Sequence, residues 1–185
     1  MRPSWDEYFM IIAKIVSTRS TCNSRHNGCV IVKNRQILST GYNGAMSGCK
    51  HCIDEISKNG MKYCQRREQN IPDIDKYNFC LASHAESNAV SLAAKFGISL
   101  KKSTAYCTLA PCFNCLKSLV VAGVKEVVYE YEYESKYQDR DNYWKSQLDQ
   151  AGIISRKLQV SYHAINTIED SLKYPTSKRI LEATS

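Results

Sequence analysis

Four residues in the middle of the chain have the types and the spacing of a catalytic metal site. His84 and Glu86 are two residues apart, and Cys112 and Cys115 are three residues apart about one strand later. One imidazole and two thiolates give three protein ligands, the number found where a catalytic zinc ion keeps its fourth position for water. Glu86 is too near His84 to be a comfortable fourth ligand on the same helix, but it can exchange protons with that water. The spacing therefore predicts Glu86 as the general acid and base beside a zinc ion.

Both halves of this pattern match a known signature without substitution. Residues 84–86 are His-Ala-Glu and residues 111–115 are Pro-Cys-Phe-Asn-Cys, the H-x-E and P-C-x-x-C motifs of zinc-dependent nucleobase deaminases. The simpler interpretations are a structural zinc site, or a lone histidine with core cysteines. A single C-x-x-C would favour those interpretations, whereas two motifs that both begin predicted helices favour catalysis.

The elements that must hold these residues follow from hydrophobic periodicity. Ser4 and Glu7 predict a capping box at the start of a first helix, whose expected apolar face is Tyr8, Ile11, Ile12, Ile15 and Val16. A hairpin is expected over 28–40, and its first strand is apolar on both faces, as in the interior of a covered sheet. Further helices are predicted over 84–95, 112–122 and 137–151, and further strands over 104–109, 125–130 and 153–160; residues 165–185 are weakly patterned.

These elements predict an α/β fold. The order strand, helix, strand over 104–130 implies parallel neighbours in one sheet. The two zinc-bearing helix starts then lie at strand-to-helix turns, where α/β proteins commonly place their sites. We expect a mixed sheet with helices on both faces.

The composition is that of an ordinary globular chain. The 185 residues are 43% hydrophobic and 23% charged, and no apolar run approaches the roughly 20 residues that span a bilayer. The N-terminal segment lacks an apolar run ending in small residues, so we expect a cytoplasmic location, the host cytoplasm if the chain is encoded by a phage, and no membrane partner. The nine cysteines should then be reduced or metal-bound. The net charge is +7, but the 25 Lys and Arg residues are scattered, which argues against a stable nucleic-acid partner.

A second group of cysteines flanks an irregular segment from about 45 to 80. This segment is long for a loop in a compact domain and would need an internal staple. A tetrahedral structural zinc site would supply one, and the four cysteines available for it are Cys22, Cys52, Cys64 and Cys80. Cys49 and His51 are competing ligands, and independent surface thiols are the alternative. Cys29 and Cys107 fall in predicted buried strands, where a free cysteine packs as a small apolar residue.

Residues 41–44, Gly-Tyr-Asn-Gly, carry two glycines around an aromatic side chain and an amide. This combination predicts a loop in which the backbone closely approaches a ligand, with a simple turn as the alternative.

With these motifs, the chain resembles the deoxycytidylate (dCMP) deaminases of the cytidine deaminase superfamily, of the bacterial and phage type. The resemblance covers about residues 5–160 and is carried by segments 19–22, 41–44, 51–52, 84–89, 108–115 and 122–125. It implies one domain over 1–185, with a three-layer fold around a central five-stranded mixed sheet. It also implies a cysteine-rich insertion at about 45–80.

The resemblance further implies a function. Family members hydrolyse dCMP to dUMP and ammonia with zinc, supplying dUMP for dTTP synthesis, as homohexamers activated by dCTP and inhibited by dTTP with Mg²⁺. By matching position, Asn43 would contact the deoxyribose hydroxyl and the Ala85 backbone would read the base, while Tyr133 with Ser24 or Arg25 would hold the phosphate. The residues implied in allosteric control are Gly41, Tyr42, Asn43, Gly44 and Lys95.

Two other functions remain open on the sequence alone. A tRNA or single-stranded nucleic-acid deaminase would use the same zinc chemistry on a flipped base, but it requires a continuous basic groove and a steep salt dependence of binding. A non-catalytic, zinc-stabilised binding module would have no use for Glu86 beside a ligand. Release of ammonia from dCMP by the purified protein discriminates among the three.

Overall fold

The computed structural model describes residues 2–72, 78–132 and 138–173. Its centre is a five-stranded sheet in the order β2-β1-β5-β6-β7. The strands are β1 (Gly28–Lys33), β2 (Gln36–Tyr42), β5 (Ser103–Leu109), β6 (Val124–Tyr131) and β7 (Ile154–Lys157). β1 is antiparallel to β2 and β5, whereas β5, β6 and β7 run parallel. The predicted α/β fold with a mixed five-stranded sheet is confirmed.

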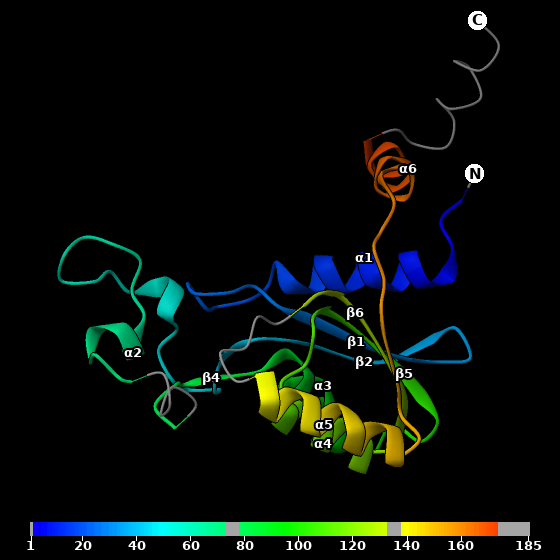
Figure 1. Cartoon of the computed structure of the whole chain (residues 1–185). Helices are drawn as coiled ribbons and strands as arrows, with labels where there is room; N and C mark the ends of the chain where they lie inside the picture. The colour runs from blue at the N-terminus through cyan, green and yellow to red at the C-terminus, as the bar shows by residue number, and fades with distance from the viewer. Residues whose placement is uncertain (1, 73–77, 133–137, 174–185) are drawn as a thin grey trace, which may run out of the picture.

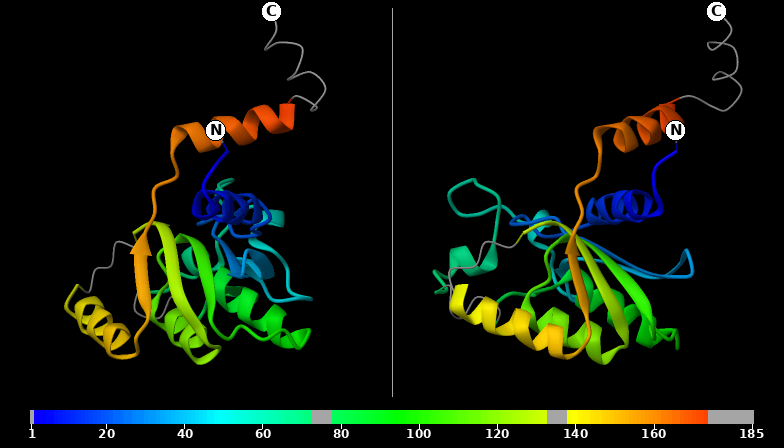
Figure 2. Two further views of the ribbon diagram at one scale, coloured as in Figure 1. Left: turned by 90° about the vertical axis from the view of Figure 1, so that its right-hand side faces the viewer. Right: turned by 45° about the vertical axis from the view of Figure 1, so that its right-hand side comes forward.

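Helices cover both faces of this sheet (Figures 1 and 2). On one face lie α1 (Trp5–Ser17) and α6 (Tyr162–Lys173), and on the other lie α3 (Ala85–Lys95), α4 (Phe113–Val121) and α5 (Gln138–Gln150). β1 is buried along almost its whole length, because its side chains alternate between two cores. Cys29 and Ile31 enter the core under α3 and α4, and Val30 and Val32 enter the core under α1. Cys29 and Cys107 are both buried, as predicted.

Two polar networks lie at the start of α1: one caps the helix, and the other fixes it to the sheet. The Ser4 hydroxyl accepts a hydrogen bond from the Glu7 backbone N–H, and the Glu7 carboxylate accepts one from the Ser4 backbone N–H, so the predicted capping box is present. Further along the sheet, the Arg156 guanidinium on β7 pairs with Asp6 at 2.8 Å and with Glu126 at 2.7 Å. Charged hydrogen bonds of this kind are stronger than neutral ones, so they hold the start of α1 against β6 and β7.

The structure confirms part of the apolar face predicted for the first helix, because Ile11 is buried and Ile12 and Val16 pack against the core, and it corrects the rest. Phe9, Met10 and Ala13 are its most deeply buried side chains, whereas Tyr8 is 41% exposed and Ile15 is 53% exposed. The helix carries apolar residues on most of its circumference, so periodicity alone could not choose the side that faces the sheet.

The prediction also missed the helix α6. Its Ala164 is buried in the α1 core, and Ile168 packs against that core. Residues 162–173 are helical because this short apolar stripe meets α1, and propensity alone did not show it.

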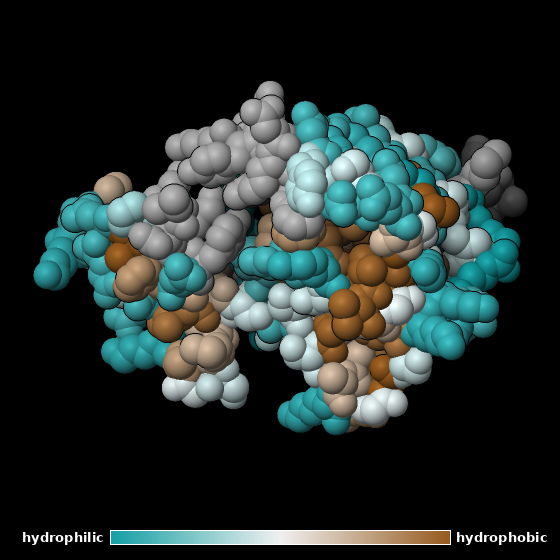
Figure 3. All heavy atoms as spheres, turned by 60° about the horizontal axis from the view of Figure 1, so that its bottom comes forward, coloured by the Kyte–Doolittle hydropathy of each residue, from teal (hydrophilic) through white to brown (hydrophobic). Residues whose placement is uncertain are grey.

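The segment expected to be irregular contains short ordered pieces. β3 (Gly44–Ala45) pairs with β4 (Ala82–Ser83), and between them lie a short 3-10 helix η1 (Cys52–Asp54) and the helix α2 (Gln65–Glu68). In Figure 3 this insertion forms a lobe on the left, with a hollow between it and the helical face. None of the helices in the described ranges is long and apolar enough to cross a membrane.

Candidate metal centre and active site

The strand-to-helix turns position the three predicted zinc ligands. His84 follows β4 and is the N-cap residue of α3, while Cys112 follows β5 and is the N-cap residue of α4. Cys115 is the third residue of α4 and is buried. The N-terminal ends of both helices therefore converge on one point, and their positive dipole ends favour thiolate over thiol there.

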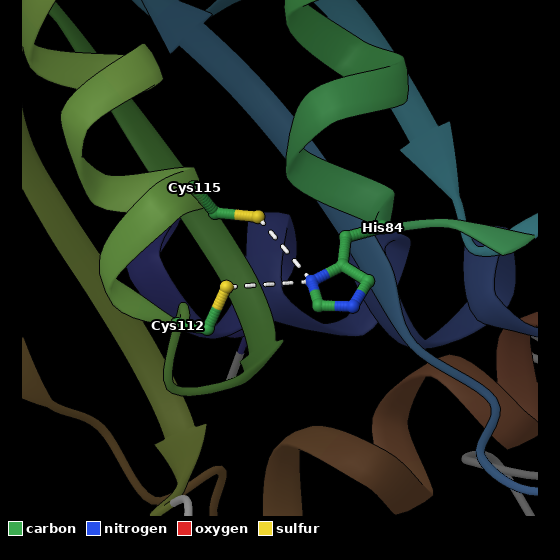
Figure 4. A group of neighbouring side chains, drawn as sticks. All are labelled: His84, Cys112 and Cys115. Carbon is green, nitrogen blue, oxygen red and sulfur yellow. Dashed lines mark hydrogen bonds between the residues drawn. The ribbon is translucent and has the colours of Figure 1, made fainter. Parts of the chain in front are cut away.

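The three side chains point toward one another (Figure 4). His84 Nδ1 lies 3.5 Å from Cys112 Sγ and 3.4 Å from Cys115 Sγ, and all three ligand atoms lie within 4.8 Å of one another. Zinc bonds of about 2.3 Å to sulfur and about 2.0 Å to nitrogen, at tetrahedral angles, would put those nitrogen and sulfur atoms about 3.5 Å apart. The observed spacing fits a zinc ion, and a group of two sulfurs and one imidazole suits that metal.

One of the two sulfur atoms already has the charge that a zinc ligand requires, and the second would lose its proton on binding the metal. A hydrogen bond from Cys115, together with the neighbouring His84, lowers the pKa of the Cys112 thiol to about 4. The same hydrogen bond, with burial, raises the pKa of Cys115. The pair therefore carries a thiolate at neutral pH. Ser87 Oγ lies 3.5 Å from Cys115 Sγ and adds a polar contact to the second sulfur.

Glu86 lies in the first turn of α3, beside the ligands. Its side chain is only 7% exposed, so it is one of the few buried acidic groups in the described chain. Burial raises the pKa of this carboxyl, while the nearby His84 opposes the rise. A carboxyl that is removed from bulk water beside a metal-binding triad has the position of a group that exchanges protons with substrate.

A segment from Ser20 to Asn27 forms a loop that leads into β1 beside the C-terminal end of β5; we call it the 20–27 loop. Asn43 bonds to both ends of this loop, because its Oδ1 accepts hydrogen bonds from the Asn27 N–H and the Ser20 hydroxyl, both at 2.8 Å. The Asn43 amide also donates to the Arg25 carbonyl at 2.7 Å. At the end of the loop, the Gly28 N–H donates to the Thr108 hydroxyl on β5. The loop is thus tied to the strand that leads into Cys112.

Residues 41–44 are not the loop that the sequence predicted. Gly41 and Tyr42 end β2, and Gly44 begins β3. The close backbone approach is made to α3: a Cβ atom on Gly41 would lie 2.1 Å from the Ala85 carbonyl oxygen and 2.5 Å from the Ala89 nitrogen. Asn88 of α3 also donates to the Tyr42 carbonyl at 2.7 Å. The glycine is therefore required for strand-to-helix packing directly behind the ligand-bearing end of α3.

The remaining residues named from the sequence lie in different places. Ser24 is half-buried and Arg25 is exposed on the 20–27 loop, and Ala85 is buried next to Glu86. Lys95 lies in the last turn of α3, about 15 Å along the helix from Ala85, with its ammonium over the Phe96 ring. Tyr133 lies outside the described residues.

Three cysteines of the predicted second group, Cys22, Cys64 and Cys80, lie near the fourth, Cys52. Their sulfur atoms do not close into a metal-binding group, because among the described residues only His84, Cys112 and Cys115 bring three ligand atoms within 4.8 Å of one another. Burial raises the pKa of the Cys52 thiol, and the charges of Cys22, Cys64 and Cys80 raise it further, so all four belong to one neighbourhood. The Cys22 sulfur accepts a hydrogen bond from the Ser24 N–H at 3.4 Å. The segments that carry these cysteines are joined by Asn23, whose amide donates to the Cys52 carbonyl at 2.6 Å and to the Tyr63 carbonyl at 3.0 Å.

Sequence reasoning missed several polar residues that support the site. They are Ser20, Asn23, Ser87, Asn88 and Thr108. Only Ser87 carried a usable signal, because a position three residues after His84 lies on the same face of a helix. The others pair across long sequence separations, which no local pattern reveals.

Comparison with known proteins gives a consistent result. Residues 3–131 match the family model described as the cytidine and deoxycytidylate deaminase zinc-binding region. The deoxycytidylate deaminase of Mycobacterium phage D29 is 36% identical over 136 residues, which are 71% of this chain and 98% of that protein. The deoxycytidylate deaminase of Saccharomyces cerevisiae is 38% identical over 133 residues, but these cover 72% of this chain and only 39% of the yeast protein.

A solved structure agrees with the sequence matches. The dCMP deaminase of cyanophage S-TIM5, in complex with dCMP and dUMP, aligns with a TM-score of 0.62 at 31% identity, covering 85% of this chain and 99% of that chain. Fold, motif and similarity therefore agree. The chain belongs to the family of cytidine and deoxycytidylate deaminases, and its His84, Cys112 and Cys115 form a group suited to zinc.

Proposed function

We propose that this protein hydrolyses dCMP to dUMP and ammonia. The observation that carries the proposal is the group of His84, Cys112 and Cys115 within 4.8 Å, with the buried carboxyl of Glu86 in the adjoining helical turn. The relatives named for this activity, and the phage relative solved with dCMP and dUMP, support the choice of substrate.

The residues divide the chemistry in a simple way. A zinc ion held by His84, Cys112 and Cys115 supplies Lewis-acid activation of a water molecule at neutral pH. Glu86 takes a proton from the attacking water and delivers it to N3 of the cytosine ring as the new C4–O bond forms. A second proton passes through Glu86 to the exocyclic amino group, the C4–N bond breaks, and ammonia leaves. The buried surroundings of Glu86 keep these transfers away from bulk water.

The substrate contacts follow from the same proposal. The Ala85 backbone, next to Glu86, would read the base. The Asn43 amide uses one N–H on the Arg25 carbonyl, and its second N–H would bind the deoxyribose hydroxyl. Ser24 or Arg25, with Tyr133, would hold the phosphate; the 20–27 loop supports this assignment because Asn43 fixes it beside the strand leading to Cys112.

We propose a second, structural zinc ion in the insertion. Its ligands would be Cys22, Cys52, Cys64 and Cys80, with Cys49 and His51 as competitors. The influence of Cys22, Cys64 and Cys80 on the pKa of Cys52, which places them in one neighbourhood, supports this set. Purified protein should contain two zinc ions per chain, and Cys52→Ser should contain one, whereas Cys29→Ser, in the core, should still contain two. One zinc ion in the wild-type protein would contradict the proposal.

Regulation and assembly are further parts of the proposal. We expect one domain over 1–185 that forms a homohexamer in the cytoplasm, activated by dCTP and inhibited by dTTP with Mg²⁺. The packing of Gly41 on α3 supports a link from segment 41–44 to the active site. Lys95 would sense the effector from the far end of the same helix. Activity titrations with dCTP and dTTP, with and without Mg²⁺, and the mass of the particle in solution test these points.

The decisive assay is ammonia release from dCMP. Glu86→Gln should retain zinc and lose most turnover, whereas His84→Ala should lose zinc as well. Glu169→Gln, on the exposed side of α6, is the matched control and should behave as wild type. Near-normal turnover in Glu86→Gln would refute the role of Glu86, and absence of turnover in the zinc-loaded wild type would refute the function.

A further inference from the structure

The insertion places an arginine on the 20–27 loop. Arg67, on the third position of α2, donates from Nη2 to the Ser24 hydroxyl at 3.3 Å. The two residues are 43 positions apart in sequence, so their contact is a product of the fold. No motif in the sequence assigns a role to Arg67.

This contact is held by a more strongly bonded neighbour. Asn23, adjacent to Ser24, donates to the carbonyls of Cys52 and Tyr63. Tyr63 immediately precedes Cys64, which is buried and is the N-cap residue of α2. The start of α2 is therefore fixed to the residue next to Ser24, and the position of Arg67 does not depend on its own exposed hydrogen bond.

The charge of Arg67 is available to a ligand. Its hydrogen-bond partner is a neutral hydroxyl, and among the described residues no carboxylate lies within ion-pair distance of it. The acidic residue next to it on α2, Glu68, accepts instead from the Ser57 hydroxyl. A guanidinium has five N–H donors, and Ser24 uses one of them. Planar, paired donors of this kind are the preferred protein partners of phosphate.

Ser24, which contacts the Arg67 guanidinium, lies on a loop that is hydrogen-bonded to the elements next to the zinc-binding group. The 20–27 loop is bonded through Gly28 to Thr108, which lies three residues before Pro111, and through Asn43 to the end of β2. The end of β2 is bonded in turn to Asn88 on α3. A substrate group that contacts Ser24 would therefore contact a loop that is hydrogen-bonded to β5, which leads to Cys112, and linked through β2 to α3, which begins after His84.

We propose that Arg67 is a specificity-determining residue that binds the 5′-phosphate of the substrate, and that it selects nucleoside monophosphates over nucleosides. The inference rests on the proposed deaminase function. It assigns a substrate role to the insertion, which delivers the guanidinium to a loop whose own hydroxyl, Ser24, completes the phosphate contact.

The test compares a nucleotide with the nucleoside that lacks its phosphate. Activity would be measured on dCMP and deoxycytidine for wild type, Arg67→Ala, Arg67→Lys and the control Lys58→Gln, which removes a charge from an exposed position in the same insertion. Loss of a charged hydrogen bond predicts a decrease of about tenfold or more in kcat/KM for dCMP in Arg67→Ala, mainly through KM. The value for deoxycytidine should stay within about twofold of wild type. Arg67→Lys should lose less than Arg67→Ala, and Lys58→Gln should match wild type.

Binding separates this inference from the function on which it rests. The affinities of dUMP and deoxyuridine, measured by calorimetry, need no turnover, and Arg67→Ala should weaken only dUMP. If wild type fails to deaminate dCMP but dUMP binding shows this selective loss, the proposed function fails and the phosphate role of Arg67 stands. Equal losses for nucleotide and nucleoside, or an unchanged affinity for dUMP, would overturn the role of Arg67.

Discussion

Replacing Gly41 by alanine tests whether the contact between β2 and α3 positions the active site. The new Cβ would lie 2.1 Å from the Ala85 carbonyl oxygen, and ordinary contact begins at 3.4 Å. The two backbones must separate by about 1.3 Å. Because both close atoms belong to backbone, no side chain can rotate away to relieve the clash. Overpacking of this kind costs about 1–3 kcal/mol of unfolding free energy.

The effect on catalysis should be larger than the effect on stability. Ala85 lies between His84 and Glu86, so a shift of α3 moves the ligand and the carboxyl together, and a misplacement of about 1 Å can cost about 100-fold in rate. If α3 moves, kcat should fall. If β2 moves instead, as an edge strand can, the Asn43 contacts to the 20–27 loop should be disturbed and KM should rise. Either response lowers kcat/KM for dCMP by about 100-fold.

The assay needs a control of similar stability. Gly152→Ala places a side chain at a φ of +64° with no atom within 4 Å, far along the chain between α5 and β7. It should cost about 1 kcal/mol through backbone strain and leave kcat/KM unchanged. Urea unfolding, zinc content and steady-state kinetics would be measured on both variants. A folded, zinc-loaded Gly41→Ala protein with wild-type kcat/KM would refute the positioning role of this contact.

Three other outcomes follow from the structure. Arg156→Ala leaves Asp6 and Glu126 without their shared cation and should lower the unfolding free energy by about 1–3 kcal/mol, with a smaller loss in high salt; an unchanged urea midpoint would contradict this. The Ser161 hydroxyl and the capping contacts lower the pKa of Glu7 from 4.5 to about 2, so its stabilisation is complete above pH 4.5 and is lost as the pH falls toward 2. Glu7→Gln should flatten the acid limb of a stability-against-pH curve, and a parallel curve would count against the linkage. A strong chelator should abolish deaminase activity and zinc should restore it, while activity that survives verified removal of zinc would contradict the metal site.

The ligand-bearing elements were predictable because their signals are local. A histidine or a cysteine at a helix N-terminus, a proline before it, and a glycine after the helix are adjacent in sequence, so α3 and α4 could be placed to within about two residues. Their β-strands were identified in the same way from short apolar runs. The burial of both faces of β1 also followed directly from its continuous apolar run.

Other features depended on partners that are distant in sequence. Segment 41–44 was predicted wrongly because Gly41 allows close packing of β2 on α3, which is distant in sequence. The helix α6 was missed because its few apolar residues are buried only by contact with the α1 core. Arg67 was invisible for the same reason, since its significance arises from Ser24, 43 residues away.

The amino-acid sequence by itself identified the candidate site of this protein: one imidazole and two thiols at the starts of two helices, a set suited to zinc, and a neighbouring carboxyl to which we assign proton transfer. The tertiary structure alone decided which surface of α1 is buried, how closely β2 approaches α3 and which arginine meets the 20–27 loop. The physical reason is that the types of the metal-binding residues and the capping of their helices depend on neighbouring residues in the sequence. Packing and long-range hydrogen bonds depend instead on which surfaces come together when the chain folds.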